Sequence, residues 1–167
     1  MSNLLSICDR LERHPLTRVE KLQRDSFIAA LKQLKLSRAK ALSVSCGDGI
    51  WDYLALSSNR GVIEITATDV VDCPVKENDM KLLRAIGQWN FQRVMADVSL
   101  PFESNSFDVA FSQDVIEHSS KPYTFLSNQY RVLAGGCYCW HSQFNETCKS
   151  SARIHWATKF SKTHRAQ

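Results

Sequence analysis

Two spacings of apolar residues alternate along the chain. Apolar residues recur at roughly helical spacing between Val19 and Leu34, and Thr17-Arg-Val-Glu20 matches a capping box, so we expect a helix over 17–36. Short β-rich runs then alternate with helical stretches. They predict strands near 41–45, 62–68, 92–96, 107–112 and 137–142, and helices near 50–56, 77–89 and 122–133. This order predicts an α/β fold in three layers, with a parallel sheet between helices.

Pro122 is well placed in the first turn of the last helix, and Gly135-Gly136 is expected to end it. The segment 145–167 follows neither spacing and has few sizeable apolar residues, so it is predicted to be a weak helix or disordered. The chain thus divides into an N-terminal helical cap (1–40), an α/β domain (41–144) and a basic, weakly structured tail (145–167).

Charge is unevenly distributed along the 167 residues, whose formal net charge is +4. Residues 1–40 and 149–167 each sum to +5, whereas 41–148 sum to −6. Basic ends can bind nucleic acid or anionic lipid, but solvated surface charge is the simpler interpretation, and a nucleic-acid partner is not expected. No apolar run suits a membrane span, and Asp9 and Arg10 interrupt any signal-peptide core, so we predict a cytoplasmic protein.

The six cysteines include no C-x-x-C pair. Cys137, Cys139 and His141 alternate along a predicted strand and would point to one face, where three such ligands could bind zinc. Alternation is a property of every strand, and free cysteines are commonly small buried apolar residues. We therefore predict no metal site.

The segment 41–50 carries the main chemical signal. It is a short apolar strand that enters a Gly47-x-Gly49 turn, and Asp69 follows about twenty residues later at the end of the next strand. Open α/β sheets hold ribose-bearing cofactors with this arrangement, because the turn allows close approach and the acid binds ribose hydroxyls. A nicotinamide-binding turn would need a third glycine near Asp52. An ordinary strand-to-helix turn is the alternative.

A series of further motifs resembles one family. In order, they are Asp97-Val-Ser-Leu-Pro-Phe102, Asn105-Ser-Phe-Asp108, Asp114-Val-Ile-Glu-His118 and Arg131-Val-Leu-Ala-Gly-Gly136. Together with Cys46-Gly-Asp-Gly49, they look like the S-adenosylmethionine-dependent methyltransferases with a Rossmann-like fold, in the broad group that includes quinone-biosynthesis methyltransferases. The resemblance covers about 40–142.

This resemblance implies S-adenosylmethionine as cofactor and a small-molecule or lipid-like acceptor. It implies cofactor-binding roles for Ser45, Gly47, Gly49, Asp69, Val70, Asp97, Val98 and Gln113. Within that set, Asp69 would bind the ribose and Asp97 the adenine amino group. His118 is the candidate general base, although ordering its loop is an alternative role.

The chain departs from the family pattern in four ways, of which the first is that residues 97–100 are one residue shorter than in many members. Ser43 replaces an acid, Ser45 replaces the first glycine of the turn, and the C-terminal antiparallel hairpin of the family sheet is expected to be missing. A sheet that ends at its fifth strand would leave an unpaired edge, through which a homodimer could form. A truncated or non-catalytic scaffold of the same fold is therefore the alternative to a methyltransferase.

Overall fold

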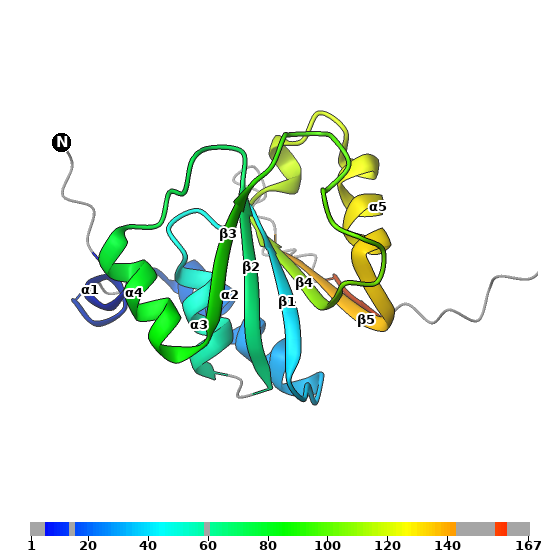
Figure 1. Cartoon of the computed structure of the whole chain (residues 1–167). Helices are drawn as coiled ribbons and strands as arrows, with labels where there is room; N and C mark the ends of the chain where they lie inside the picture. The colour runs from blue at the N-terminus through cyan, green and yellow to red at the C-terminus, as the bar shows by residue number, and fades with distance from the viewer. Residues whose placement is uncertain (1–5, 14–15, 59–60, 143–155, 160–167) are drawn as a thin grey trace, which may run out of the picture.

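A computed structural model describes residues 6–13, 16–58, 61–142 and 156–159. Six strands form one sheet, and helices pack on it (Figure 1). The helices are α1 (Ile7–Arg13), α2 (Arg18–Gln33), α3 (Ile50–Ser58), α4 (Glu77–Ile86), the 3-10 helix η1 (Ile116–His118) and α5 (Pro122–Val132). The strands are β1 (Ala39–Val44), β2 (Val62–Asp69), β3 (Gln88–Arg93), β4 (Phe107–Gln113), β5 (Leu133–Ser142) and β6 (Trp156–Lys159).

The strand order is β3-β2-β1-β4-β5-β6, and the first five strands are parallel. The predicted α/β sheet of five parallel strands is therefore confirmed. A difference lies at the end of the chain, where β6 pairs antiparallel with β5 although no strand was expected after β5. The segment is only four residues long, too short for a clear alternation. The outer strand on this side of the sheet is therefore β6 instead of β5, and the homodimer through a sheet edge stays a prediction.

Apolar residues fill both faces of the sheet. On one face, α2 and α3 enclose a core that includes Phe27, Leu31 and Leu54 above Ile65 and Phe111. On the other face, α5 and the segment after β3 cover a second cluster around Leu42, Val44, Ala110 and Val132. Neighbouring residues of one strand thus point to opposite cores, which is why the strands read as nearly continuous apolar runs.

The capping box at Thr17 and Glu20 and the proline at the start of α5 are present as predicted. Two predicted details are wrong, and one helix was not predicted. Strand β3 begins at Gln88 instead of about 92, because α4 ends at Ile86 and Gly87 continues in an extended conformation. Helix α5 ends before the glycine pair at 135–136, which lies within β5. Helix α1 was not predicted as a separate element.

Among the described residues, no helix combines the length and apolar character needed to cross a membrane. The described part also contains no group of three His, Cys, Asp or Glu residues that could hold a metal ion. Cys137, Cys139 and His141 lie in β5, where only the backbone is described. The basic tail lies outside the described residues, apart from β6.

Candidate functional site

The carboxyl edge of the sheet contains the point where the strand order reverses. From β1 the chain moves through β2 to β3 on one side, and β4 and β5 lie on the other side of β1. In open α/β sheets, ligands bind at such a reversal, outside the carboxyl ends of the strands. This edge faces the top of Figure 1, and three of the predicted site residues, Ser45, Asp69 and Gln113, lie at the ends of β1, β2 and β4.

The turn after β1 bends through three residues with positive φ. Ser45 has φ 56°, Gly47 has φ 53° and Gly49 has φ 80°. The backbone N–H of Cys46 donates to the carbonyl of Thr68 at 2.8 Å, which fixes the turn against the end of β2. Helix α3 then begins at Ile50, whose N–H donates to Asp48 Oδ1 at 3.2 Å. The backbone therefore follows a glycine-type path even though Ser45 is not glycine.

The two glycines of the turn have different surroundings. A Cβ added to Gly47 would meet nothing within 4 Å, so open space lies beside this backbone. A Cβ added to Gly49 would lie 3.2 Å from Val75 Cγ2 and 3.3 Å from Leu83 Cδ1. Close packing thus accounts for Gly49 without a ligand, whereas the space at Gly47 is free for one.

Asp69 ends β2 and is almost fully buried. Its Oδ2 accepts the Gly47 N–H at 3.2 Å, and its Oδ1 accepts the N–H groups of Val70 at 2.8 Å and Val71 at 3.4 Å. A carboxylate offers about four acceptor positions, so Asp69 has remaining capacity for hydroxyl donors. The carboxylate thus joins the turn after β1 to the loop after β2, as a ribose-binding acid would.

Asp97 and Val98 lie in the segment after β3. Asp97 is half-buried, and its two carboxylate oxygens accept hydrogen bonds from Ser120 Oγ at 2.5 Å and Ser119 Oγ at 2.7 Å. These hydrogen bonds hold the pKa of Asp97 below its usual value. The Val98 carbonyl accepts from Asn128 Nδ2 at 2.8 Å. Asp97 thus ties the segment after β3 to the segment after η1.

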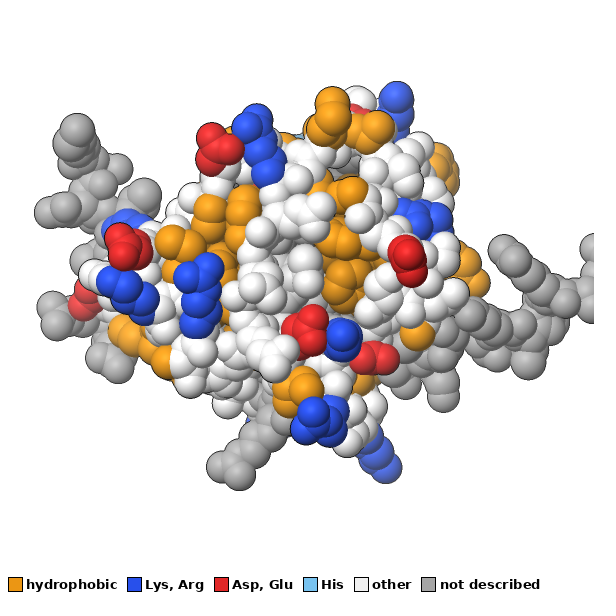
Figure 2. Space-filling model, viewed as in Figure 1, with side chains coloured by type: hydrophobic (Ala, Val, Ile, Leu, Met, Phe, Trp, Pro, Cys, Tyr) orange, Lys and Arg blue, Asp and Glu red, His pale blue; other side chains and the backbone are white. Residues whose placement is uncertain are grey.

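Apolar side chains are exposed near this edge. Val70, Val71 and Val98 are each about half exposed, and Met95 is 78% exposed. Figure 2 shows apolar side chains gathered on both sides of a central band of polar and backbone atoms. An aromatic ring of a ligand would find apolar contacts at such an edge.

Gln113 ends β4, and its Nε2 donates to Asp114 Oδ2 at 3.0 Å. Asp114 has φ 51°, and its other oxygen, Oδ1, is buried with no hydrogen-bond partner among the described residues. His118 closes η1 and is exposed. Asp114 is therefore more buried than His118.

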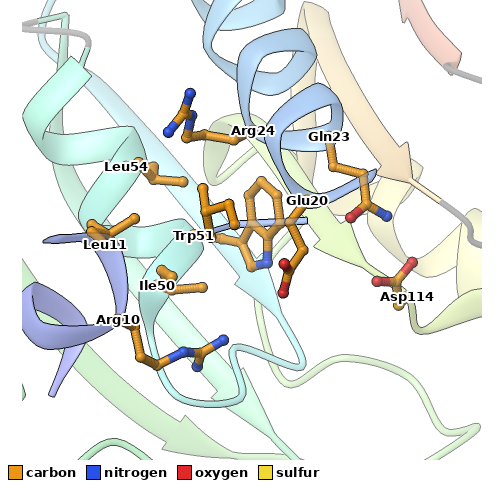
Figure 3. Close-up of a pocket in the computed structure, with 10 residues that line it drawn as sticks. Arg10, Leu11, Glu20, Gln23, Arg24, Ile50, Trp51, Leu54 and Asp114 are labelled. Carbon is orange, nitrogen blue, oxygen red and sulfur yellow. The ribbon is translucent and has the colours of Figure 1, made fainter. Parts of the chain in front are cut away.

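A cavity of about 160 Å³ lies between α1, α2, α3 and the residue after β4 (Figure 3). We call it the helical cavity. Its lining is Arg10, Leu11, Leu16, Glu20, Gln23, Arg24, Ile50, Trp51, Leu54 and Asp114. It adjoins the turn, because Ile50 directly follows Gly49. Sequence reasoning missed it, since its lining comes mainly from three separate helices, one of which, α1, was not predicted.

Helix α1 is fixed above the turn. Arg10 forms an ion pair with Asp48, the central residue of the turn. Ile7 is 1% exposed, and its N–H donates to Asp79 Oδ1 at 3.1 Å, so α1 also contacts α4. Helix α1 thus contacts both the turn after β1 and helix α4.

Asp52 is a second acid that sequence reasoning did not assign. It lies fully buried in the first turn of α3, and its Oδ2 accepts the indole N–H of Trp89 at 2.7 Å. Burial raises the pKa of Asp52 to about 6, against the opposing effect of hydrogen bonds with Ser43 and Trp89. Burial also raises the pKa of the nearby Cys46 thiol, with added effects of the Asp52 and Asp69 charges, so Cys46 is a neutral core residue.

Comparison with known proteins identifies the family. A family model described as a methyltransferase domain matches residues 42–140, more than half of the chain. The chain therefore belongs to the methyltransferase domain family, whose fold is the Rossmann-like sheet described above and whose cofactor is S-adenosylmethionine. No curated protein matches the chain.

Several solved structures are similar in fold. One is the [4+2]-cyclase SpnF, with a TM-score of 0.63 at 21% identity over 78% of this chain and 49% of that one. Another is an S-adenosylmethionine-dependent methyltransferase from Aquifex aeolicus, with a TM-score of 0.61 at 16% identity over 89% of this chain and 78% of that one. A third is a putative methyltransferase from Bacillus halodurans, with a TM-score of 0.53 at 25% identity over 71% and 51%. The chain spans about half the length of the first and third.

Proposed function

We propose that the chain binds S-adenosylmethionine at the carboxyl edge of β1, β2 and β4 and transfers its methyl group to a small-molecule or lipid-like acceptor. The observation that carries this proposal is the open space at Gly47 beside the Asp69 carboxylate, at the reversal of strand order. When bound, the cofactor supplies a methyl group on a positively charged sulfur.

The chain's own residues would divide the binding between them. Gly47 would let the backbone approach the ligand, and Asp69 would accept hydrogen bonds from the ribose hydroxyls. Asp97 would accept from the adenine amino group, with Val70 and Val98 as apolar neighbours of the ring. Positioning accounts for most of the rate in such a displacement, so no nucleophilic side chain is required. His118 is the residue to test as a general base.

Calorimetric titration with S-adenosylhomocysteine, the demethylated product, tests the cofactor site. Gly47→Asn places a side chain in the open space, while asparagine tolerates positive φ better than most residues. We expect saturable binding by the unaltered chain and a loss of affinity of about tenfold or more in Gly47→Asn, equivalent to ~1.4 kcal/mol.

Lys35→Asn is the matched control. Lys35 also has positive φ, at 48°, but it precedes β1 at the opposite edge of the sheet. It should bind S-adenosylhomocysteine as the unaltered chain does. No heat of binding from the unaltered chain, or equal losses in both variants, would contradict the proposal.

A non-catalytic scaffold is the second candidate. Ser45 occupies the first glycine position of the turn with φ 56°, where a glycine would carry no Cβ. The fold also does not fix the reaction, since one similar structure is a cyclase. Binding of S-adenosylhomocysteine without methyl transfer to any of a panel of acceptors would favour this candidate.

A further inference from the structure

We propose that the helical cavity is the acceptor site and that it takes a compact amine, whose nitrogen is bound by Asp114. This inference rests on the proposed methyltransferase function, because it names the class of acceptor. It depends on the charges that line the cavity, on the size of the cavity and on its place beside the turn.

The two arginines of the lining already have acidic partners. Arg10 pairs with Asp48, and Arg24 pairs with Asp25 through its Nε at 2.9 Å and its terminal Nη2 at 2.8 Å. In Figure 3 the guanidinium group of Arg24 points away from Asp114. Their charges are therefore compensated by neighbouring carboxylates, and the arginines are not set to bind an anionic ligand.

The acids of the lining keep capacity for a donor. Asp114 Oδ1 is buried and has no hydrogen-bond partner among the described residues, although Oδ2 accepts from Gln113. Glu20 uses Oε2 to accept the N–H and hydroxyl of Thr17, both at 2.8 Å, and these hydrogen bonds lower the pKa of Glu20. Both acids are thus hydrogen-bond acceptors. A buried acceptor left without a donor is unfavourable, and a ligand N–H that reaches it would supply the missing hydrogen bond.

The remaining wall is apolar and the space is small. Leu11, Leu16, Ile50, Trp51 and Leu54 contribute apolar side chains. A dry cavity of about 150 Å³ can hold benzene, so a volume of about 160 Å³ suits one ring or a short branched chain. The indole of Trp51 adds a surface that attracts cations. A small apolar body with one amine matches this lining.

The chemistry of transfer is consistent with an amine. The nitrogen lone pair forms the new bond to the methyl carbon, the carbon–sulfur bond breaks, and its electron pair stays on sulfur, which becomes a neutral thioether. An ammonium ion has no free lone pair, so it first loses one proton to solvent. The methylated product then carries the positive charge, and the Asp114 carboxylate can accept a hydrogen bond from the nitrogen before and after transfer.

Three probes of one shape test the charge preference on the unaltered chain: benzylamine, benzyl alcohol and benzoate. Their binding is followed in NMR spectra through the side-chain N–H signal of Trp51, with and without saturating S-adenosylhomocysteine. We expect benzylamine to bind at least about tenfold more tightly than benzyl alcohol, and we expect no binding of benzoate. Benzylamine should still bind when S-adenosylhomocysteine is present.

Asp114→Asn should weaken benzylamine binding by about tenfold or more and leave benzyl alcohol within about twofold. Glu103→Gln, which removes one exposed carboxylate before β4, is the matched control and should change neither. The inference would be overturned if benzoate bound as tightly as benzylamine. It would also be overturned if Asp114→Asn bound benzylamine as tightly as the unaltered chain does.

Displacement of benzylamine by S-adenosylhomocysteine would also overturn it, since the cavity would then hold part of the cofactor. If S-adenosylhomocysteine does not bind at all, the proposed function is refuted, whether or not benzylamine binds. The two proposals therefore fail on separate measurements.

Discussion

The buried carboxyl of Asp52 allows a quantitative prediction of how stability depends on pH. Burial raises its pKa from 3.8 to about 6 in the folded chain. The folded state then binds the proton more tightly than the unfolded state. The cost of ionising Asp52 is therefore absent below the unfolded pKa, grows as the pH rises through the interval, and is complete above the folded pKa.

The size of this effect follows from the pKa difference. A difference of about two units, at about 1.36 kcal/mol per unit, means that ionised Asp52 lowers the free energy of unfolding by about 3 kcal/mol. Asp52→Asn keeps an oxygen that can accept the Trp89 indole N–H, yet it has no charge to bury. The advantage of this variant over the unaltered chain should grow by about 2 kcal/mol between about pH 4.5 and about pH 7.5.

Urea denaturation of both proteins at the two pH values measures the change. Asp72→Asn, at a side chain that is 92% exposed and paired with Arg93, provides the control and should show little pH dependence relative to the unaltered chain. If the free energies of unfolding of Asp52→Asn and the unaltered chain differed by the same amount at both pH values, burial would not raise the pKa of Asp52.

Three further predictions concern the turn and α1. Ser45→Gly should raise the free energy of unfolding by about 1 kcal/mol, because glycine adopts φ 56° without the Cβ penalty; a denaturation curve with an unchanged midpoint would refute this. Gly49→Ala should lower thermal stability by about 2 kcal/mol, and more than Gly47→Ala does, because only its Cβ meets Val75 at 3.2 Å; equal losses would argue against the packing role. Ile7→Ala should cost about 2–5 kcal/mol if α1 is docked as described, whereas a loss near zero would show that α1 adds little to stability.

Much of the fold could be predicted because its signals are local. The capping box at Thr17, the apolar runs of β1, β2 and β4, and the proline that opens α5 each depend on residues close in sequence. Strand β3 was misplaced because its start depends on where α4 stops; Gly87, which follows α4, leaves no room for a Cβ beside Leu56, a residue far from it in sequence. Strand β6 is defined by its antiparallel pairing with β5. Four residues are too few to predict such a pairing from their own sequence.

The candidate site could be predicted only where one motif contained it. The turn and Asp69 lie at a fixed spacing, and the structure joins them through the hydrogen bond from Gly47 to Asp69. Their binding roles stay predictions. The helical cavity could not be predicted, because Arg10, Glu20 and Trp51 come from three helices whose relative placement is a tertiary property. The same holds for the contact between Asp52 and Trp89, which are 37 residues apart.

The replacement of the first turn glycine by Ser45 changes the energy of the turn more than its path. Ser45 adopts φ 56°, the left-handed conformation that a glycine would adopt at no steric cost, so β1 still bends toward Gly47. The open space is bounded by Gly47, where an added Cβ would meet nothing within 4 Å. A strain of about 1 kcal/mol in the backbone is small beside the binding energy of a cofactor with micromolar affinity, about 8 kcal/mol. Serine in place of that glycine is therefore compatible with cofactor binding. The space stays open because position 47 is a glycine, which has no side chain to fill it.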